Sequence, residues 1–266
     1  MTHDLILAHL TTLSLAPPDM IRVASRTGYR GVGLRLASVT EGGTAYPLMD
    51  DPAMLQATRR AAAETGIAVH DIECVCLTPD LDVADVEPLL AAGAELGARY
   101  VIAMPCDRDR GRMADRFAAL CALARPRGLG VVLGFAPGAA VSTLEAALDL
   151  VVMAGAPNGG VLVDTLHVAH SGGTLAALSA LPRRLVPFVH LSDGLQAGNG
   201  SERLPPGEGA LDLAGILTRL PPGTPVAIAV PMERMTREQG PEAVALHVRR
   251  ATTHLLDQLA GSTVHA

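Results

Sequence analysis

Residues 161–167 read Val-Leu-Val-Asp-Thr-Leu-His and show the unit from which this chain is built. An apolar run typical of a buried strand ends at Asp164, and His167 follows one helical turn later. The same change from a short β-type run to an Ala-rich amphipathic stretch recurs along the chain. The predicted strands are residues 5–10, 31–36, 67–77, 100–104, 131–136, 161–164, 186–191 and 226–230. The amphipathic segments between them include residues 52–65, 83–96, 112–124, 143–154, 211–220 and 242–259.

Eight strands that alternate with helices predict an α/β fold, a parallel sheet closed into one (β/α)8 TIM barrel. The chain has 266 residues, a normal length for one such barrel. An open doubly wound sheet is the rival fold. No G-x-G-x-x-G or P-loop motif follows an early strand, which weakens the nucleotide-binding form of that rival. We expect a single domain over residues 1–266, with the Pro- and Gly-rich loop 197–209 lying over the active-site face.

The composition narrows the classes of partner. Net charge is −6 with scattered basic residues, and the chain has three Tyr, three Phe and no Trp. These features argue against a phosphate-backbone footprint and against base stacking, so we expect no nucleic-acid partner. The start MTHDLILAHL lacks a basic segment followed by a long apolar one, and no apolar run is long enough to span a bilayer. We therefore expect a cytoplasmic protein with a small-molecule substrate and no membrane partner, and leave a homodimer open.

The four cysteines indicate no disulfide framework, because a chain of this size does not need one. Cys74 and Cys76 are separated by one residue and lack the spacing of a zinc knuckle or a redox pair. We interpret Cys74, Cys76, Cys106 and Cys121 as buried free thiols.

Polar side chains gather where the predicted strands end, which is where TIM barrels carry their working residues. The loop after the seventh strand adds Arg203 and Glu208. Together these groups predict a polar rim that could converge on a small polar substrate. Read in chain order, the strand ends give His9, Arg35, Glu73, Cys106, Gly134, Asp164 with His167, His190 with Asp193, and Ala229.

Each candidate also has a structural interpretation. A single strand histidine such as His9 or His70 is more often hydrogen-bonded structure than catalyst. Glu73 could be buried and paired with Arg35, or it could contact substrate. Arg203 could be a solvated loop charge, although its inward-folding loop favours the binding of an anion or hydroxyl group. The strongest functional candidates are Asp164 and His167, a carboxylate at a strand end with an imidazole one turn later.

The chain resembles the sugar phosphate isomerase/epimerase family, the xylose isomerase-like TIM barrels. That family includes inosose and hydroxypyruvate isomerases, tagatose epimerases and 3-dehydroshikimate dehydratases. The resemblance covers nearly the whole chain, and the order and spacing of its motifs are more specific than any one of them. The motifs are GVGLRL at 31–36, GARYV at 97–101, VLVDTLH at 161–167, VHLSD at 189–193 and PGEG at 206–209.

The resemblance implies a divalent metal held by Glu on strand five, Asp on strand six, His or Gln on strand seven and Glu on strand eight. Here Asp164 and His190 occupy the positions on strands six and seven, whereas Gly134 and Ala229 stand where the two glutamates are expected. Hard divalent ions need several anionic oxygen ligands. We therefore expect no tightly bound cofactor, with weak divalent binding left open.

A rebuilt metal site would need other ligands, and the sequence offers His167, Asp193 or Glu233. The first functional hypothesis is a metal-independent isomerase, epimerase or dehydratase-type lyase that removes a proton next to a carbonyl. It uses the His190/Asp164 pair as base. His167 or Glu208 serves as proton partner. Substrate contacts are assigned to Arg203, Arg35, Glu73, His9 and Asp193, the two arginines stabilising the oxyanion.

Two alternatives stay open. One is a metal-dependent sugar isomerase or epimerase with a rebuilt site, and the other is a non-catalytic protein that binds a ligand at the barrel mouth. Both follow from the absence of glutamate at Gly134 and Ala229, because that loss removes the usual proton carriers together with the metal ligands.

Overall fold

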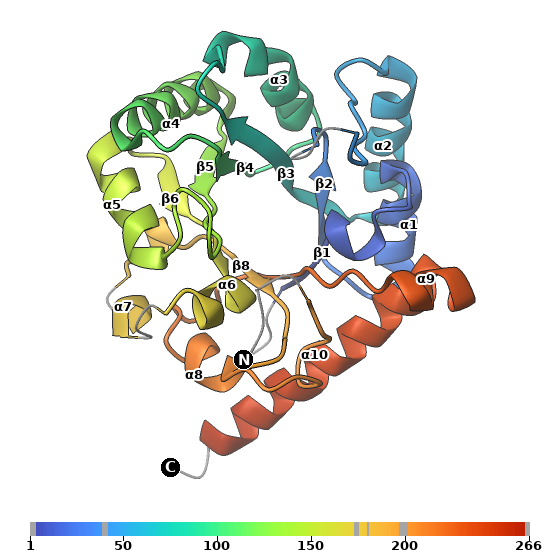
Figure 1. The fold of residues 1–266 in the computed structure, drawn as a ribbon. Coiled ribbons are helices and arrows are strands. Elements are labelled where there is room, and N and C mark those ends of the chain that lie inside the picture. Colours follow the sequence, from blue (N-terminus) through green and yellow to red (C-terminus); the bar gives the residue numbers. More distant parts are fainter. Residues whose placement is uncertain (1–3, 39–41, 173–175, 180, 197–201, 264–266) are drawn as a thin grey trace.

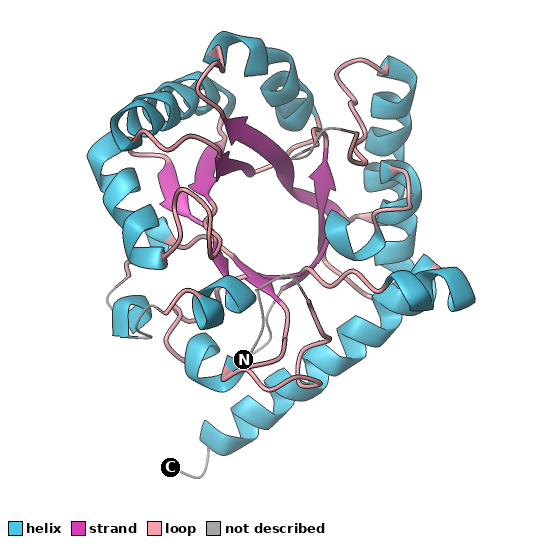
Figure 2. Ribbon diagram, in the orientation of Figure 1, coloured by secondary structure: helices cyan, strands magenta, loops and turns pink. Residues whose placement is uncertain are grey.

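The computed structural model describes residues 4–38, 42–172, 176–179, 181–196 and 202–263. Nine strands form one sheet in the order β6-β5-β4-β3-β2-β1-β9-β8-β7, and every pairing is parallel. The edge strands β6 (Gly159–Val161) and β7 (Val163–Asp164) are consecutive in the chain and separated only by Leu162. They are two parts of the predicted sixth strand, so the sheet closes on itself. Figures 1 and 2 show the resulting ring of strands with helices outside it. The predicted TIM barrel is confirmed.

The remaining strands correspond to the predicted apolar runs, most of them with ends trimmed by a few residues. They are β1 (Leu5–Ala8), β2 (Gly31–Arg35), β3 (Ala68–Leu77), β4 (Tyr100–Pro105), β5 (Gly130–Leu133), β8 (Val189–Leu191) and β9 (Val226–Ile228).

The helices surround the sheet in chain order. They are α1 (Pro17–Thr27), α2 (Pro52–Thr65), α3 (Glu87–Glu95), α4 (Arg110–Ala124), α5 (Leu144–Ala154), α6 (Thr165–His170), α7 (Ala176–Ser179), α8 (Leu213–Leu217), α9 (Glu233–Gln239) and α10 (Pro241–Thr263). The predicted helix 83–96 is a 3₁₀ turn, Val83–Val86, followed by α3. None of the helices in the described segments combines the length and the apolar character needed to cross a bilayer.

Helix α2 shows how the sequence sets the ends of these helices. The Asp51 carboxylate accepts a hydrogen bond from the Met54 N–H, and Pro52 occupies the first turn, where no N–H donor is needed. The helix ends at Gly66, whose φ of 70° lies in the left-handed region that glycine adopts without strain. The chain then re-enters the sheet as β3.

Apolar side chains form two clusters, one outside the sheet and one inside the barrel. The larger one joins the helices to the outer face of the strands, and the smaller one fills the barrel. The interior cluster consists of Ile6, Ala8, Cys74, Ile102, Val132, Leu162, Phe188, Ala227 and Ala229. Ala229, at one of the two positions where the family resemblance implies glutamate, is therefore fully buried packing.

The register between β2 and β3 shifts between Val32 and Gly33. Gly33 pairs with Asp71, and a Cβ atom placed on Gly33 would lie 2.6 Å from Asp71 Oδ1. A glycine at this point therefore leaves room for a fully buried carboxylate beside the strand.

Closure of the barrel depends on the close approach of Gly160 in β6 to the backbone that leads into β8. A Cβ atom at Gly160 would lie 2.9 Å from the Leu185 carbonyl oxygen, which is backbone and cannot turn away. We predict that Gly160→Ala lowers the free energy of unfolding by about 1–3 kcal/mol in urea denaturation, because the added methyl overpacks this contact. Gly261→Ala is the matched control, since a Cβ there meets open space. An unchanged midpoint for Gly160→Ala would contradict the described closure.

Candidate active site

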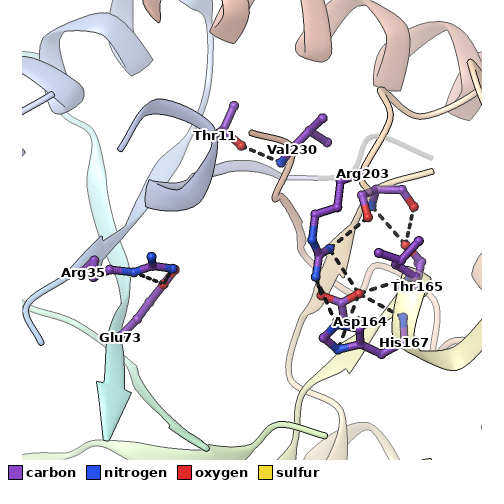
Figure 3. Close-up of polar contacts among 10 residues, drawn as sticks. Thr11, Arg35, Glu73, Asp164, Thr165, His167, Arg203 and Val230 are labelled. Atoms are coloured by element: carbon purple, nitrogen blue, oxygen red, sulfur yellow. Dashed lines mark hydrogen bonds and ion pairs between the residues drawn. The ribbon is translucent and has the colours of Figure 1, made fainter. Parts of the chain in front are cut away.

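A buried ion pair joins the end of β7 to the loop after β8. Arg203 Nη2 donates to Asp164 Oδ2 at 2.8 Å and Nη1 donates to Oδ1 at 3.2 Å. Asp164 Oδ1 also accepts from the backbone N–H groups of Leu166 and His167 at 3.1 and 3.3 Å, which caps α6. Figure 3 shows Arg203 reaching the carboxylate from its loop. Asp164 is only 5% exposed, so these donors replace its water shell.

The charge of Asp164 is fixed by these neighbours. Burial alone would raise the pKa of Asp164, but Arg203 and then His167 and His190 lower it well below the ordinary value. The carboxylate is therefore ionised at neutral pH, and its charge is balanced within the protein by one guanidinium.

Arg203 has two further polar contacts besides Asp164. Its Nη1 donates to Ser192 Oγ at 2.9 Å, and its Nη2 faces His167 Nε2 at 3.3 Å. A guanidinium only donates, so His167 Nε2 is unprotonated and accepts. Burial lowers the pKa of His167, partly offset by Asp164, which agrees with a neutral imidazole. The three predicted residues Asp164, His167 and Arg203 thus form one connected cluster.

Asp193 holds the loop that carries Arg203. Its carboxylate accepts from the backbone N–H groups of Gly194, Gly207, Gly209 and Leu211 at 2.8–3.1 Å. Its backbone also pairs with Leu204 in an antiparallel bridge. All four bonds are made within the protein, so the structure places Asp193 as the organiser of the loop. Its contact with substrate stays a prediction. Residues 197–201 of the predicted loop 197–209 lie outside the described residues.

Glu208 does not join the cluster around Arg203. Its carboxylate is about half exposed and lies 3.1 Å from Nε2 of His247 on α10. The sequence interpretation expected this loop to turn Glu208 inward. In the structure Arg203 points inward to Asp164, whereas Glu208 points outward to His247. Glu208 is therefore not placed to act with Asp164 and His167.

A second buried ion pair lies across the barrel opening from the first. Arg35 at the end of β2 donates from Nη2 and Nε to Glu73 Oε2 at 2.9 and 3.1 Å. Figure 3 shows the two pairs on opposite sides of the view. Burial alone would raise the pKa of Glu73, but Arg35, and after it His190, bring it below the ordinary value. Glu73 Oε1, in a residue only 2% exposed, has no hydrogen-bond partner among the described residues.

His9 supports this second pair from the backbone side. Its Nδ1 accepts from the Arg35 N–H at 2.8 Å, so the ring proton is on Nε2, which donates to the Leu15 carbonyl at 3.0 Å. The ring stacks on Tyr46 with centroids 5.1 Å apart. Burial lowers the pKa of His9, which keeps the ring neutral. Both nitrogens serve the backbone, so the geometry gives His9 a structural role, and substrate binding by it stays a prediction.

His190 stands between the two ion pairs. It is the register partner of Asp164 in the β7–β8 ladder, and it contributes to the lowered pKa of both Asp164 and Glu73. The residue is 8% exposed, and its Nε2 is buried without a hydrogen-bond partner in the described part of the chain. The structure pairs Asp164 with Arg203, so the expected His190/Asp164 pair is not built as a direct hydrogen bond.

The residues at the four inherited metal positions do not fit a divalent ion. Gly134 has no side chain, and a Cβ there would lie 2.7 Å from Met104 Sδ. Ala229 provides no ligand, and both oxygens of Asp164 are bound to Arg203. Of the residues considered for rebuilding the site, His167 and Asp193 are engaged as described, and Glu233 is exposed on α9.

The structure adds Asp71 of β3, which the sequence interpretation did not propose as a functional residue. Asp71 is fully buried, its Oδ2 lies 3.1 Å from His70 Nδ1, and its Oδ1 has no partner among the described residues. The signal in the sequence was the spacing of Asp71 and Glu73, two residues apart in the largely apolar strand β3.

A sequence profile described as xylose isomerase-like TIM barrel matches residues 21–246. The chain belongs to this family. The inosose isomerase of Bacillus velezensis is 26% identical over an alignment of 152 residues, which covers 52% of this chain and 54% of that protein. The chain thus spans about half the length of the curated relative it matches.

Two solved structures with low identity share the fold. A crystal structure of the IolI protein with a bound zinc atom has a TM-score of 0.81 at 18% identity, with 96% of this chain and 99% of that chain covered. The 3-keto-D-glucoside 4-epimerase of E. coli in its apo form has a TM-score of 0.72 at 16% identity, with 94% and 100% covered.

Removal of the Arg203 charge should expose the cost of a buried, unpaired carboxylate. We predict that Arg203→Ala lowers the free energy of unfolding by about 3–5 kcal/mol, and that Asp164→Asn in the same chain recovers much of that loss. Urea denaturation of both single variants and the double variant measures the coupling. Arg22→Ala is the control, because its 3.1 Å pair with Asp19 is exposed and should be worth about 0–1 kcal/mol. Additive losses at Arg203 and Asp164 would rule out the described pair.

His9 should make the stability depend on pH. The pKa of His9 in the folded protein is below the ordinary value of 6.5. The contribution of neutral His9 to the free energy of unfolding is therefore complete above pH 6.5. The contribution is lost as the pH falls below 6.5 toward the folded pKa, by up to about 1.4 kcal/mol per pH unit. We predict that His9→Asn, which has no titrating ring, shows a shallower loss of unfolding free energy between about pH 6.5 and 5. His254→Asn on the exposed face of α10 should keep the wild-type slope, and an unchanged slope in His9→Asn would refute the assignment.

Proposed function

We propose that this chain is an isomerase or epimerase that moves a proton next to the carbonyl group of a small polyhydroxy ketone. Three observations support the proposal. The chain belongs to the xylose isomerase-like family, part of it matches an inosose isomerase, and acid/base groups converge at the carboxyl end of its barrel. The observation that carries most weight is the buried, unpartnered Nε2 of His190 beside the Arg203 cluster.

His190 is the proton acceptor in this proposal. An imidazole nitrogen without a hydrogen-bond partner has a free position for an incoming C–H proton, whereas both nitrogens of His9 are occupied. The base and the Asp164–Arg203 pair come from neighbouring strands, so a ketone at the mouth can meet both. Asp164 acts through Arg203 and not as a direct partner of His190.

Arg203 stabilises the charge that the reaction creates. When the C–H bond breaks, its proton goes to His190 and the bonding electrons move onto the carbonyl oxygen to form an enolate. A guanidinium fixed by Asp164 and Ser192 supplies donors that need little reorganisation at that moment. Isomerisation follows when the enolate oxygen takes the proton of the hydroxyl group on the deprotonated carbon and the proton on His190 is delivered to the former carbonyl carbon. Return of the proton to the other face of the carbon that lost it gives epimerisation instead. Dehydration follows when the hydroxyl group on the next carbon takes the proton from His190 and leaves as water, and the enolate electrons re-form the carbonyl and make the new C=C bond.

The inherited metal positions have no part in this mechanism, because Gly134 and Ala229 carry no ligand atoms and Asp164 is bound to Arg203. We propose that the small residues at these two positions make room for substrate. His167 is the proton partner, because its unprotonated Nε2 lies 3.3 Å from Arg203 Nη2, next to the guanidinium that stabilises the enolate oxygen.

Proton exchange with solvent tests the proposed function directly. We predict that the protein, incubated with inosose or a related ketose in D₂O, introduces deuterium at the carbon beside the carbonyl, followed by proton NMR. His190→Asn should reduce the exchange rate by at least about 100-fold, because the acceptor is lost. His254→Asn, an exposed histidine of α10, should retain the wild-type rate. Full exchange by His190→Asn, or no exchange of any ketose or ketocyclitol by the wild type, would reject the proposal.

A further inference from the structure

We infer that a divalent transition-metal ion binds inside the barrel between Asp71, Glu73 and His190. The three side chains come from β3 and β8. Only His190 belongs to the inherited ligand positions, so the site is displaced toward β3 from the one that Gly134 and Ala229 have lost.

Three side chains that could hold a metal ion converge at this place. One donor atom from each of Asp71, Glu73 and His190 lies within 4.8 Å of the other two. The residues are 0%, 2% and 8% exposed, and Asp71 Oδ1, Glu73 Oε1 and His190 Nε2 have no hydrogen-bond partner in the described segments. Burial of a polar atom without a partner is unfavourable, so three such residues in one cluster indicate a missing positive partner.

Asp71 and Glu73 each use one carboxylate oxygen for a contact with a neighbouring side chain and leave the other without a partner in the described segments. Asp71 Oδ2 is fixed by His70 Nδ1 at 3.1 Å, and Glu73 Oε2 is fixed by Arg35 at 2.9 Å. Each residue therefore keeps one carboxylate oxygen without a hydrogen-bond partner in the described segments. Neighbours that orient ligands in this way are typical of metal sites and tune their affinity.

The donor set determines the class of cation. Two carboxylates supply anionic oxygens, one of them on Glu73, which is also paired with Arg35, and the His190 imidazole adds a nitrogen ligand. One nitrogen and two oxygens suit Zn²⁺, Mn²⁺ or Co²⁺ better than Ca²⁺ or Mg²⁺, which prefer oxygen alone. Zinc–ligand distances are about 2.0–2.2 Å, so ligands on opposite sides of an ion lie about 4 Å apart. A spread of at most 4.8 Å needs only a small inward movement.

Gly33 supports the same interpretation from β2. A Cβ there would lie 2.6 and 2.9 Å from the two oxygens of Asp71, so glycine is the residue that lets this carboxylate sit inside the barrel. Gly33→Ala should therefore displace the Asp71 carboxylate and weaken the site without removing a ligand.

The inference goes beyond the proposed function and concerns binding without substrate, so either can fail while the other stands. An ion on Nε2 of His190 would prevent this atom from taking a proton. The proton transfer proposed for His190 therefore belongs to the metal-free protein.

Titration of the metal-free protein with Co²⁺ and Zn²⁺ tests the site. We expect one equivalent of Co²⁺ to give visible d–d absorption, Zn²⁺ to displace it, and Zn²⁺ to raise the melting temperature. Asp71→Asn, Glu73→Gln and His190→Asn should each weaken binding by at least about 10-fold. Gly33→Ala should weaken it as well, and circular dichroism checks that each variant is folded.

Asp164→Asn is the matched control, because Asp164 is a ligand in the inherited arrangement but not in this one. It should bind Co²⁺ as tightly as the wild type. Absence of saturable binding in the wild type overturns the inference. Binding that survives Asp71→Asn and is lost in Asp164→Asn overturns it in favour of the inherited positions.

Discussion

The ion pair between Arg203 and Asp164 determines the character of the barrel mouth. A buried carboxylate requires a positive partner, and in this chain the partner is a guanidinium from the loop after β8. Asp164 of this pair caps α6, and Arg203 contacts His167. The pair also uses both oxygens that a metal at the inherited position would need. Arg203 thus binds the carboxylate that the family resemblance assigns to a metal.

The mouth can be understood as two buried ion pairs with one imidazole between them. Arg35 and Glu73 lie on one side and Arg203 and Asp164 on the other. On the Asp164 side both carboxylate oxygens have donors, whereas on the Glu73 side one oxygen has none. Because the oxygens of Asp164 are already bound, we propose proton transfer on that side. Because Glu73 keeps one oxygen without a partner in the described segments, we propose cation binding on the other side. His190 is close enough to both sides to lower the pKa of Asp164 and of Glu73.

Much of the fold was predictable from the sequence, because short apolar runs alternate with amphipathic segments of helical length. The cluster of Asp164, His167 and Arg203 could also be predicted. Asp164 and His167 lie at or just after a strand end, and Arg203 lies in the loop after the next strand. The outward direction of Glu208 was not predictable, because it depends on the bonds that Asp193 makes to the loop backbone. Asp71 was missed because the register shift at Gly33 creates its space, and no local pattern in β3 reports a shift that involves the neighbouring strand.

In the loop segment Pro206–Gly–Glu–Gly209 the two glycines determine the backbone shape, whereas the side chain of Glu208 has little part in it. Gly207 has a φ of 87°, and a Cβ on Gly209 would lie 2.3 Å from Asp193 Oδ1. Glu208 between them is exposed, and its carboxylate lies 3.1 Å from His247 on α10. Evolutionary drift should therefore be tolerated at the acidic position and resisted at its two glycine neighbours. Homologues that lack the glutamate but keep both glycines should still place an arginine at the position of Arg203.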